Sequence, residues 1–261
     1  MADRDYKAFI VEGEAREPLI IDNISKVFFS HGNFKIITLP ASENIYMLWK
    51  KLKADDFDTD IIEVLRESND DIGKQLDGLS RDDFSEVFLF FDYDMHQTNL
   101  AKDDDTDVVK QMLESFDNET ENGKLYISYP MVEALRDYQP GVCGNRAVCF
   151  VETTDMAEYK KASAVRAVNP QFKEYNYESW RDIIDVFSMK VSCLFDHTDT
   201  FEYERYTEIV NPSAIYLLEE KKTKAEGVFV LSAFPEFLVE YYGGKLWRTC
   251  VRHRSNKREN C

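Results

Sequence analysis

Acidic residues follow two apolar runs of the sequence at the points where those runs end. Glu12 and Gly13 come directly after KAFIV, and Asp92 and Asp94 come directly after EVFLFF. Carboxylates two residues apart at the end of a strand leave it on the same side. Their oxygens are ligands that Mg²⁺ and Mn²⁺ prefer, and such an ion polarises a phosphate and lowers the pKa of a bound water. The pattern therefore indicates metal-assisted phosphate chemistry at Glu12, Asp92 and Asp94.

Five further residues are weaker candidates, each with a plainer interpretation beside it. Glu133, in YPMVEAL, is either a fourth carboxylate ligand or an ordinary surface residue of a helix. His96 follows the Asp-x-Asp pair and is either a general acid, a substrate contact or a loop histidine without a role. Lys190 either neutralises charge on a phosphate or is an exposed helix lysine. Glu14 and Glu17 are either ligands or acids that stabilise the start of a helix.

Parallel strands joined by helices would position these side chains, because the carboxyl ends of such strands meet at one edge of a sheet. The first 140 residues alternate between short apolar runs and amphipathic stretches, which is typical of this arrangement. The expected strands are 7–11, 34–39, 86–91 and 124–128, and the expected helices are 17–29, 42–53, 107–116 and a helix that begins at Pro130 and ends at Asp137.

The remainder of the chain has a different pattern. Residues 139–175 contain Pro and Gly with little periodicity and indicate a loop-rich passage or boundary. Beyond it, 178–194 is helical in pattern, 203–220 indicates a helix broken near Pro212, and 228–242 is strongly apolar. We therefore expect an α/β domain over residues 1–140 and a mainly helical C-terminal region with a basic tail over 141–261.

The charge of the chain excludes some classes of protein. The 261 residues include 49 acidic and 32 basic ones, a formal net charge of −17, which argues against a general nucleic-acid coat or a binder of anionic membranes. Residues 55–117 hold 20 acidic and 5 basic side chains, a net of −15, whereas 245–261 carry +5. No apolar run approaches the roughly 20 residues that span a bilayer, and the charged start is unlike a signal peptide. A cytoplasmic protein that does not bind membranes is expected.

The five cysteines form no CxxC pair, which predicts neither a disulfide framework nor a structural zinc.

The order of these motifs resembles the Toprim domain of primases, topoisomerases and OLD-type nucleases. FIVEGE precedes an amphipathic stretch, and FLFFDYD follows a later strand. The EGxxxEP opening, the Asp-x-Asp pair with His96 behind it, and YPMVEAL are most similar to small bacterial defence proteins of the RloB, OLD and abortive-infection types, which work beside an ATPase. The resemblance covers about residues 5 to 140 and implies a Rossmann-like parallel sheet flanked by helices. It also implies Glu12 as the acid/base residue, with Asp92 and Asp94 as Mg²⁺ ligands. Arg16 and the acidic insertion 55–83 depart from the family pattern.

Together these features lead us to expect a nuclease that depends on Mg²⁺ or Mn²⁺, cleaves DNA or RNA, and serves anti-phage defence under a partner ATPase. The strong negative field predicts that activity requires a metal, a basic partner or both. A homo-oligomer is compatible with the sequence. One alternative is a non-catalytic, partner-regulated sensor or interaction module on a Toprim-like fold. Another is a phosphotransferase with Asp92 as nucleophile, although His96 stands where that motif usually has Thr.

Overall fold

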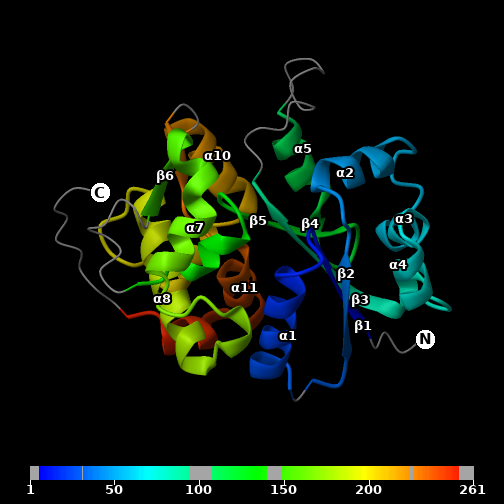
Figure 1. The fold of residues 1–261 in the computed structure, drawn as a ribbon, viewed down its shortest axis with the longest axis horizontal. Coiled ribbons are helices and arrows are strands. Elements are labelled where there is room, and N and C mark those ends of the chain that lie inside the picture. The colour runs from blue at the N-terminus through cyan, green and yellow to red at the C-terminus, as the bar shows by residue number, and fades with distance from the viewer. Residues whose placement is uncertain (1–5, 31, 94–106, 140–148, 224–225, 253–261) are drawn as a thin grey trace. The chain divides into compact units, whose positions relative to one another are not determined.

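The structure is a computed structural model that describes residues 6–30, 32–93, 107–139, 149–223 and 226–252 (Figure 1). Its contacts divide the chain into two compact units. The sheet unit comprises residues 1–91 and 100–125, and the helical unit comprises residues 92–99 and 126–261. No helix among the described residues is long and apolar enough to cross a membrane.

A five-stranded sheet with the strand order β2-β1-β3-β5-β4 forms the centre of the sheet unit. Strand β1 pairs in parallel with both β2 and β3, whereas the short β4 pairs antiparallel with β5. The predicted α/β fold class is confirmed at this level. The strands are β1 (Tyr6–Val11), β2 (Lys35–Pro40), β3 (Phe84–Asp92), β4 (Asp117–Asn118) and β5 (Gly123–Ser128).

The apolar sequence of β1 explains its central place in this sheet. Ala8, Phe9, Ile10 and Val11 are all fully buried, so both faces of the strand are covered. Helices flank the sheet, with α1 on one side of it and α3 and α4 on the other (Figure 1). They are α1 (Glu17–Phe28), α2 (Ile45–Lys53), α3 (Ile61–Ser68), α4 (Asp70–Gln75) and α5 (Val108–Ser115), with a short 3-10 helix η1 (Arg81–Asp83) before β3.

Capping residues decide where several of these helices begin. The helix expected from Ser42 begins at Ile45, because the side chain of Asn44 accepts a hydrogen bond from the N–H of Met47, whereas Ser42 has a φ of 55°. Asp60 and Asn69 cap α3 and α4 in the same way, inside the acidic stretch, where none of the expected helices lies. Polar caps and short apolar faces therefore allow α3 and α4 to form in the acidic stretch despite its charge.

The helical unit is mainly helical, as predicted. Its two longest helices, α8 and α11, pack against each other, and Trp180 and Trp247 are among its largest fully buried side chains. The α-helices are α7 (Met156–Arg166), α8 (Tyr177–Leu194), α9 (Tyr203–Ile209), α10 (Pro212–Thr223) and α11 (Ala233–Cys250). Strands β6 (Phe150–Glu152) and β7 (Gly227–Phe229) pair antiparallel, and the 3-10 helices are η2 (Val132–Arg136), η4 (Thr153–Asp155) and η5 (Phe172–Glu174).

Two expectations for this unit were wrong. The passage predicted to be loop-rich contains α7, which the sequence hides because only Tyr159 and Ser163 of this helix are buried and it has almost no apolar face. The helix expected to begin at Pro130 is the shorter 3-10 helix η2, which begins at Val132. The break near Pro212 is confirmed, because α9 ends at Ile209 and α10 begins at Pro212.

One boundary between the units falls within β5, between residues 125 and 126, whereas we expected the division at residue 140. The end of β5 and the residues after it belong to the helical unit because their backbone is bonded to it. Tyr129 and Leu231 exchange two backbone hydrogen bonds of 2.7 and 2.9 Å, and the hydroxyl of Ser128 accepts one of 3.3 Å from the N–H of Ala233. Sequence patterns do not report such long-range pairing.

Candidate functional site

Glu12 follows β1, and Asp92 is the last residue of the neighbouring parallel strand β3. Val11 of β1 pairs in register with Phe90 of β3, so Glu12 lies one residue and Asp92 two residues beyond a shared rung of the ladder. The carboxyl ends of both strands therefore reach the same edge of the sheet, as the sequence predicted. Both side chains are partly buried.

Backbone hydrogen bonds hold the turn after β1 in place. The carbonyl of Val11 accepts a hydrogen bond of 2.8 Å from the N–H of Ala41, and the carbonyl of Glu12 accepts one of 3.1 Å from the N–H of Ser42. The hydroxyl of Ser42 donates to Oε1 of Glu14 at 2.6 Å. Glu14 is thus an exposed acid with a local structural partner.

Glu17 is a buried acid at this edge of the sheet. It stands in the first turn of α1, and only 8% of it is exposed. Its carboxylate lies over Gly13, because a Cβ added to Gly13 would be 2.9 Å from Oε2 of Glu17. The five-residue spacing from Glu12 to Glu17 is the feature of the sequence that points to Glu17. Acids are common in first turns of helices, so this spacing alone does not distinguish a metal ligand from an acid that stabilises the start of a helix.

Across the described residues, no group of three or more His, Cys, Asp or Glu side chains is placed to hold a metal ion. Asp94 and His96 lie outside the described residues, so their roles as metal ligand and substrate contact remain predictions.

Glu133 lies in the helical unit, on η2, and only 1% of it is exposed. Its alternative interpretation as a surface residue is therefore wrong. Oε1 of Glu133 is 3.9 Å from the ammonium nitrogen of Lys160 on α7, a side chain that is half exposed. The role of Glu133 as a metal ligand remains a prediction.

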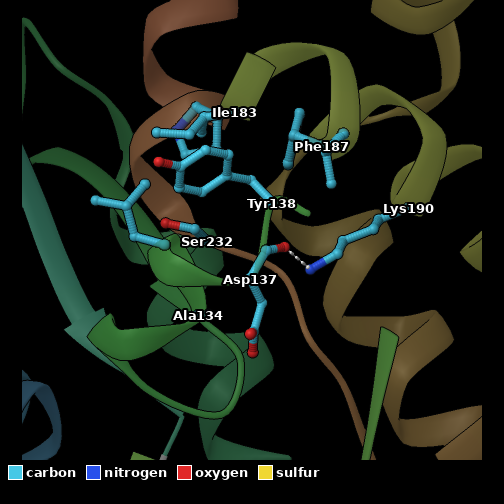
Figure 2. A pocket seen from close by; sticks show the side chains of 10 residues that line it. Ala134, Asp137, Tyr138, Ile183, Phe187, Lys190 and Ser232 are labelled. Carbon is cyan, nitrogen blue, oxygen red and sulfur yellow. Dashed lines mark hydrogen bonds between the residues drawn. The ribbon is translucent and has the colours of Figure 1, made fainter. Parts of the chain in front are cut away.

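Lys190 is buried as well, with 4% exposed, so the alternative of an exposed helix lysine is also wrong. Its ammonium group donates a hydrogen bond of 2.7 Å to the backbone carbonyl of Asp137 and so connects α8 to the end of η2 (Figure 2). An apolar helix face with one lysine in it does not reveal such a partner, because the carbonyl is 53 residues away in the sequence. The contact gives Lys190 a structural role.

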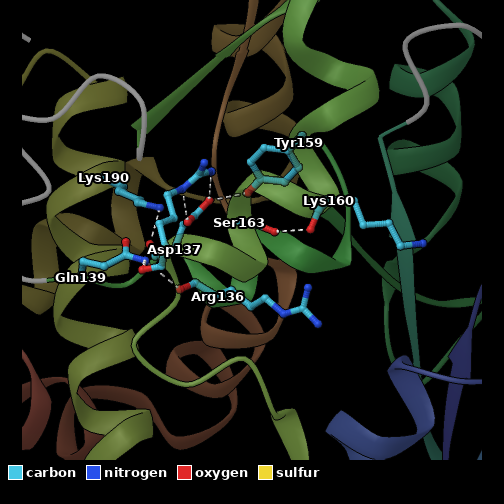
Figure 3. A network of polar contacts seen from close by, with 8 residues as sticks. Arg136, Asp137, Gln139, Tyr159, Lys160, Ser163 and Lys190 are labelled. Atoms are coloured by element: carbon cyan, nitrogen blue, oxygen red, sulfur yellow. Dashed lines mark hydrogen bonds and ion pairs between the residues drawn. The ribbon is translucent and has the colours of Figure 1, made fainter.

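The carboxylate of Asp137 is the centre of a buried polar network (Figure 3). Oδ1 and Oδ2 accept hydrogen bonds of 2.7 Å from Nε and Nη2 of Arg166, and Oδ2 also accepts one of 2.7 Å from the hydroxyl of Tyr159. Burial raises the pKa of Tyr159 well above its ordinary value, and Asp137 raises it further. These hydrogen bonds give both oxygens of a fully buried carboxylate a donor, and they connect α7 to the end of η2.

A small pocket beside this network is lined by residues from the end of η2, from α8 and from the start of α11 (Figure 2). Asp137, Tyr138, Lys190 and Ser232 provide its polar groups. Its volume is about 10 Å³, which is room for about one water molecule. The pocket is therefore too small for a nucleotide.

Comparisons of the chain with protein-family models, with curated proteins and with solved structures find no match.

Proposed function

We propose that this chain is a divalent-metal-dependent nuclease of the Toprim type, which cleaves phosphodiester bonds of DNA or RNA. The observation that carries the proposal is the register of β1 and β3, which brings the strand ends bearing Glu12 and Asp92 to one sheet edge. Acidic residues at the carboxyl ends of adjacent parallel strands are where an open α/β sheet places its ligands. The EGxxxEP and Asp-x-Asp motifs at these two strand ends supply the resemblance to Toprim nucleases.

The donors at this edge fit Mg²⁺ or Mn²⁺. They are carboxylate oxygens, and Gly13 leaves the space beside its Cα to the carboxylate of Glu17. Glu12, Asp92 and Asp94 would hold the ion, with Glu133 as the predicted fourth ligand. The bound ion supplies a Lewis acid for the phosphate and a water of lowered pKa.

The residues of the chain have separate tasks in this proposal. The carboxylate of Glu12 takes a proton from the attacking water and is held by a turn whose carbonyl groups bond to Ala41 and Ser42. Asp92, the last residue of β3, presents its carboxylate from a regular element rather than a loop. His96 is the proposed substrate contact. For Lys190, the other candidate, the hydrogen bond to the carbonyl of Asp137 favours the structural role.

The charge distribution supports control by a partner. With a net charge of −17, the chain repels the phosphate backbone, so it binds nucleic acid weakly by itself. We propose that an ATPase with basic surface supplies the missing attraction and that the pair serves anti-phage defence by abortive infection. The nuclease is then restrained until the partner and the metal are both present.

A cleavage assay on mixed DNA and RNA tests the proposal. The full chain is incubated with each substrate in Mg²⁺, in Mn²⁺ or in EDTA, with and without the ATPase encoded next to it. We expect cleavage with metal and partner, and loss of cleavage in Glu12→Gln and in Asp92→Asn. The control is Asp22→Asn, an exposed acid of α1 that is paired with Lys26.

Trapping of a covalent intermediate, together with the cleavage assay, separates the alternative functions. An aspartyl-phosphate trapped by a fluoride analogue, with Asp92 essential and Glu12 dispensable, would identify a phosphotransferase. Equal cleavage by the wild type and Glu12→Gln would contradict the proposed nuclease. A chain that binds no metal and cleaves nothing with its partner would identify a sensor or interaction module.

A further inference from the structure

Tyr93 separates the two acids of the Asp-x-Asp pair in the sequence, and its side chain is bonded within the helical unit. Its hydroxyl donates a hydrogen bond of 2.6 Å to Oε1 of Glu220 on α10, a residue 127 positions further along the chain. By their contacts, Asp92 and Tyr93 both belong to the helical unit. The residue next to a proposed metal ligand is therefore bonded to α10.

Two further contacts hold Tyr93 in place. Its backbone N–H donates a hydrogen bond of 2.9 Å to the carbonyl of Ser128. Its ring lies against the rings of Tyr129 and of Tyr216 on α10, with 5.0 and 6.3 Å between the ring centroids. Both of these tyrosines are buried. The backbone, the ring and the hydroxyl of Tyr93 thus all have partners in the helical unit.

Helix α10 is itself held on both sides of Glu220 in the sequence. Glu219 is buried, and its Oε2 accepts a hydrogen bond of 3.0 Å from the N–H of Phe229 in β7. The ammonium group of Lys222 donates one of 2.6 Å to the carbonyl of Leu194, the last residue of α8. A helix held in this way gives the tyrosine hydroxyl an acceptor in a defined position.

We propose that Tyr93 is a positioning residue through which α10 controls the metal site at Asp92. The inference rests on the proposed nuclease function and adds a link by which the helical unit regulates that site. Groups that orient metal ligands typically change metal affinity about 10- to 100-fold when they are removed. Because Tyr93 is bonded at its backbone, ring and hydroxyl, a shift of α10 moves the backbone from which the adjacent carboxylate extends.

Hydrogen exchange of the full chain tests this link without metal. The amide of position 93 is protected by its hydrogen bond to Ser128. We expect its exchange to become about tenfold faster in Tyr93→Phe and in Glu220→Ala, while the amides of α8 exchange as in the wild type. Glu220→Gln should keep the exchange slow, because its amide oxygen still accepts a hydrogen bond from the hydroxyl.

Calorimetric titration with Mg²⁺ and with Mn²⁺ tests the control of the metal site. The binding of interest is the part that Asp92→Asn removes. We expect Tyr93→Phe and Glu220→Ala each to weaken it about tenfold, and Glu220→Gln to leave it unchanged. The double variant Tyr93→Phe with Glu220→Ala should bind no more weakly than the weaker single variant, because both remove the same hydrogen bond.

Two matched variants serve as controls for both measurements. Tyr175→Phe removes a tyrosine hydroxyl that is bonded to the carbonyl of Asn169, elsewhere in the helical unit. Glu208→Ala removes an exposed acid of α9 that is paired with Arg205. Both should leave the exchange at position 93 and the metal affinity unchanged.

Two results would overturn the proposal. One is unchanged exchange at position 93 in Tyr93→Phe, which would show that the hydroxyl does not hold this part of the chain. The other is faster exchange with unchanged metal affinity, which would make the bond to Glu220 a structural contact alone. A wild type that binds neither ion would instead contradict the proposed nuclease, and the exchange at position 93 would still decide whether α10 holds the residue beside Asp92.

Discussion

Val11 of β1 and Phe90 of β3 are register partners in a parallel pair of strands, and this pairing determines where Glu12 and Asp92 leave the sheet. Backbone hydrogen bonds fix the register, so the placement does not depend on how the two side chains are oriented. A slip by one residue would exchange the side chains of β1 between its two covered faces and disrupt their packing. The buried side chains of β1 therefore help to fix the position of the candidate site.

Gly13→Ala tests whether Glu17 belongs to that site. The new Cβ would lie 2.9 Å from Oε2 of Glu17, so the carboxylate has to move. We expect a loss of about 1 kcal/mol in the free energy of unfolding and a loss of cleavage of about tenfold or more. Urea unfolding and cleavage rates measure the two effects.

A double-mutant cycle with Glu17→Gln provides the control for this prediction. If Gly13→Ala acts by displacing Glu17, the double variant is no less active than Glu17→Gln alone. Additive losses would show that the turn after β1 is disturbed for another reason.

Asp137→Asn tests the buried network of the helical unit. The substitution leaves the guanidinium of Arg166 without the carboxylate that accepts its two hydrogen bonds of 2.7 Å. Breaking a buried ion pair costs about 3–5 kcal/mol. Chemical denaturation measures the loss, and Glu208→Gln, which breaks the exposed pair with Arg205, should change stability by less than about 0.5 kcal/mol. A similar, small effect of both variants would contradict the account of this network.

Lys190→Met separates a structural role from a substrate contact. The side chain keeps its apolar length but leaves the carbonyl of Asp137 without the ammonium donor at 2.7 Å. We expect a loss of about 1–3 kcal/mol in the free energy of unfolding. The control Lys161→Met removes an exposed lysine of the same charge and should have little effect. Unchanged stability with reduced cleavage would instead assign Lys190 to the substrate.

Much of the sheet unit could be predicted from the sequence, because strands buried on both faces are continuous apolar runs and helices carry an apolar stripe. The observed β1, β2, β3 and β5 and helices α1 and α5 differ from the predicted bounds by one or two residues. The same patterns placed Glu12 and Asp92 at strand ends.

The parts that were missed depend on contacts between distant residues. Helix α7 contacts the core through Met156 and Tyr159 and bonds to Asp137 through Tyr159 and Arg166, so it has no continuous apolar face and no periodic signal. The burial of Lys190 depends on a carbonyl 53 residues away. The buried acids Glu219 and Glu236 are indistinguishable in sequence from surface glutamates, because their burial follows from packing between α10, β7 and α11.

Cys250, the last residue of α11, predicts a pH dependence of stability. Burial raises the pKa of its thiol from 9.0 to about 11. Since the folded chain favours the protonated thiol, this contribution to stability is fully present below pH 9 and is lost as the pH rises towards 11. The difference in unfolding free energy between the wild type and Cys250→Ala should therefore be constant up to pH 9 and should shrink between pH 9 and 11. A difference that does not change with pH would contradict the burial of this thiol.

The most direct test of the account is the rate of metal-dependent cleavage by the full chain together with its partner ATPase, compared with the rate for Glu12→Gln. The account predicts cleavage of DNA or RNA that requires Mg²⁺ or Mn²⁺ and falls by at least about a hundredfold in Glu12→Gln, with the fold intact by circular dichroism. Equal rates for the two chains, or cleavage by the wild type alone in EDTA at physiological salt, would contradict it.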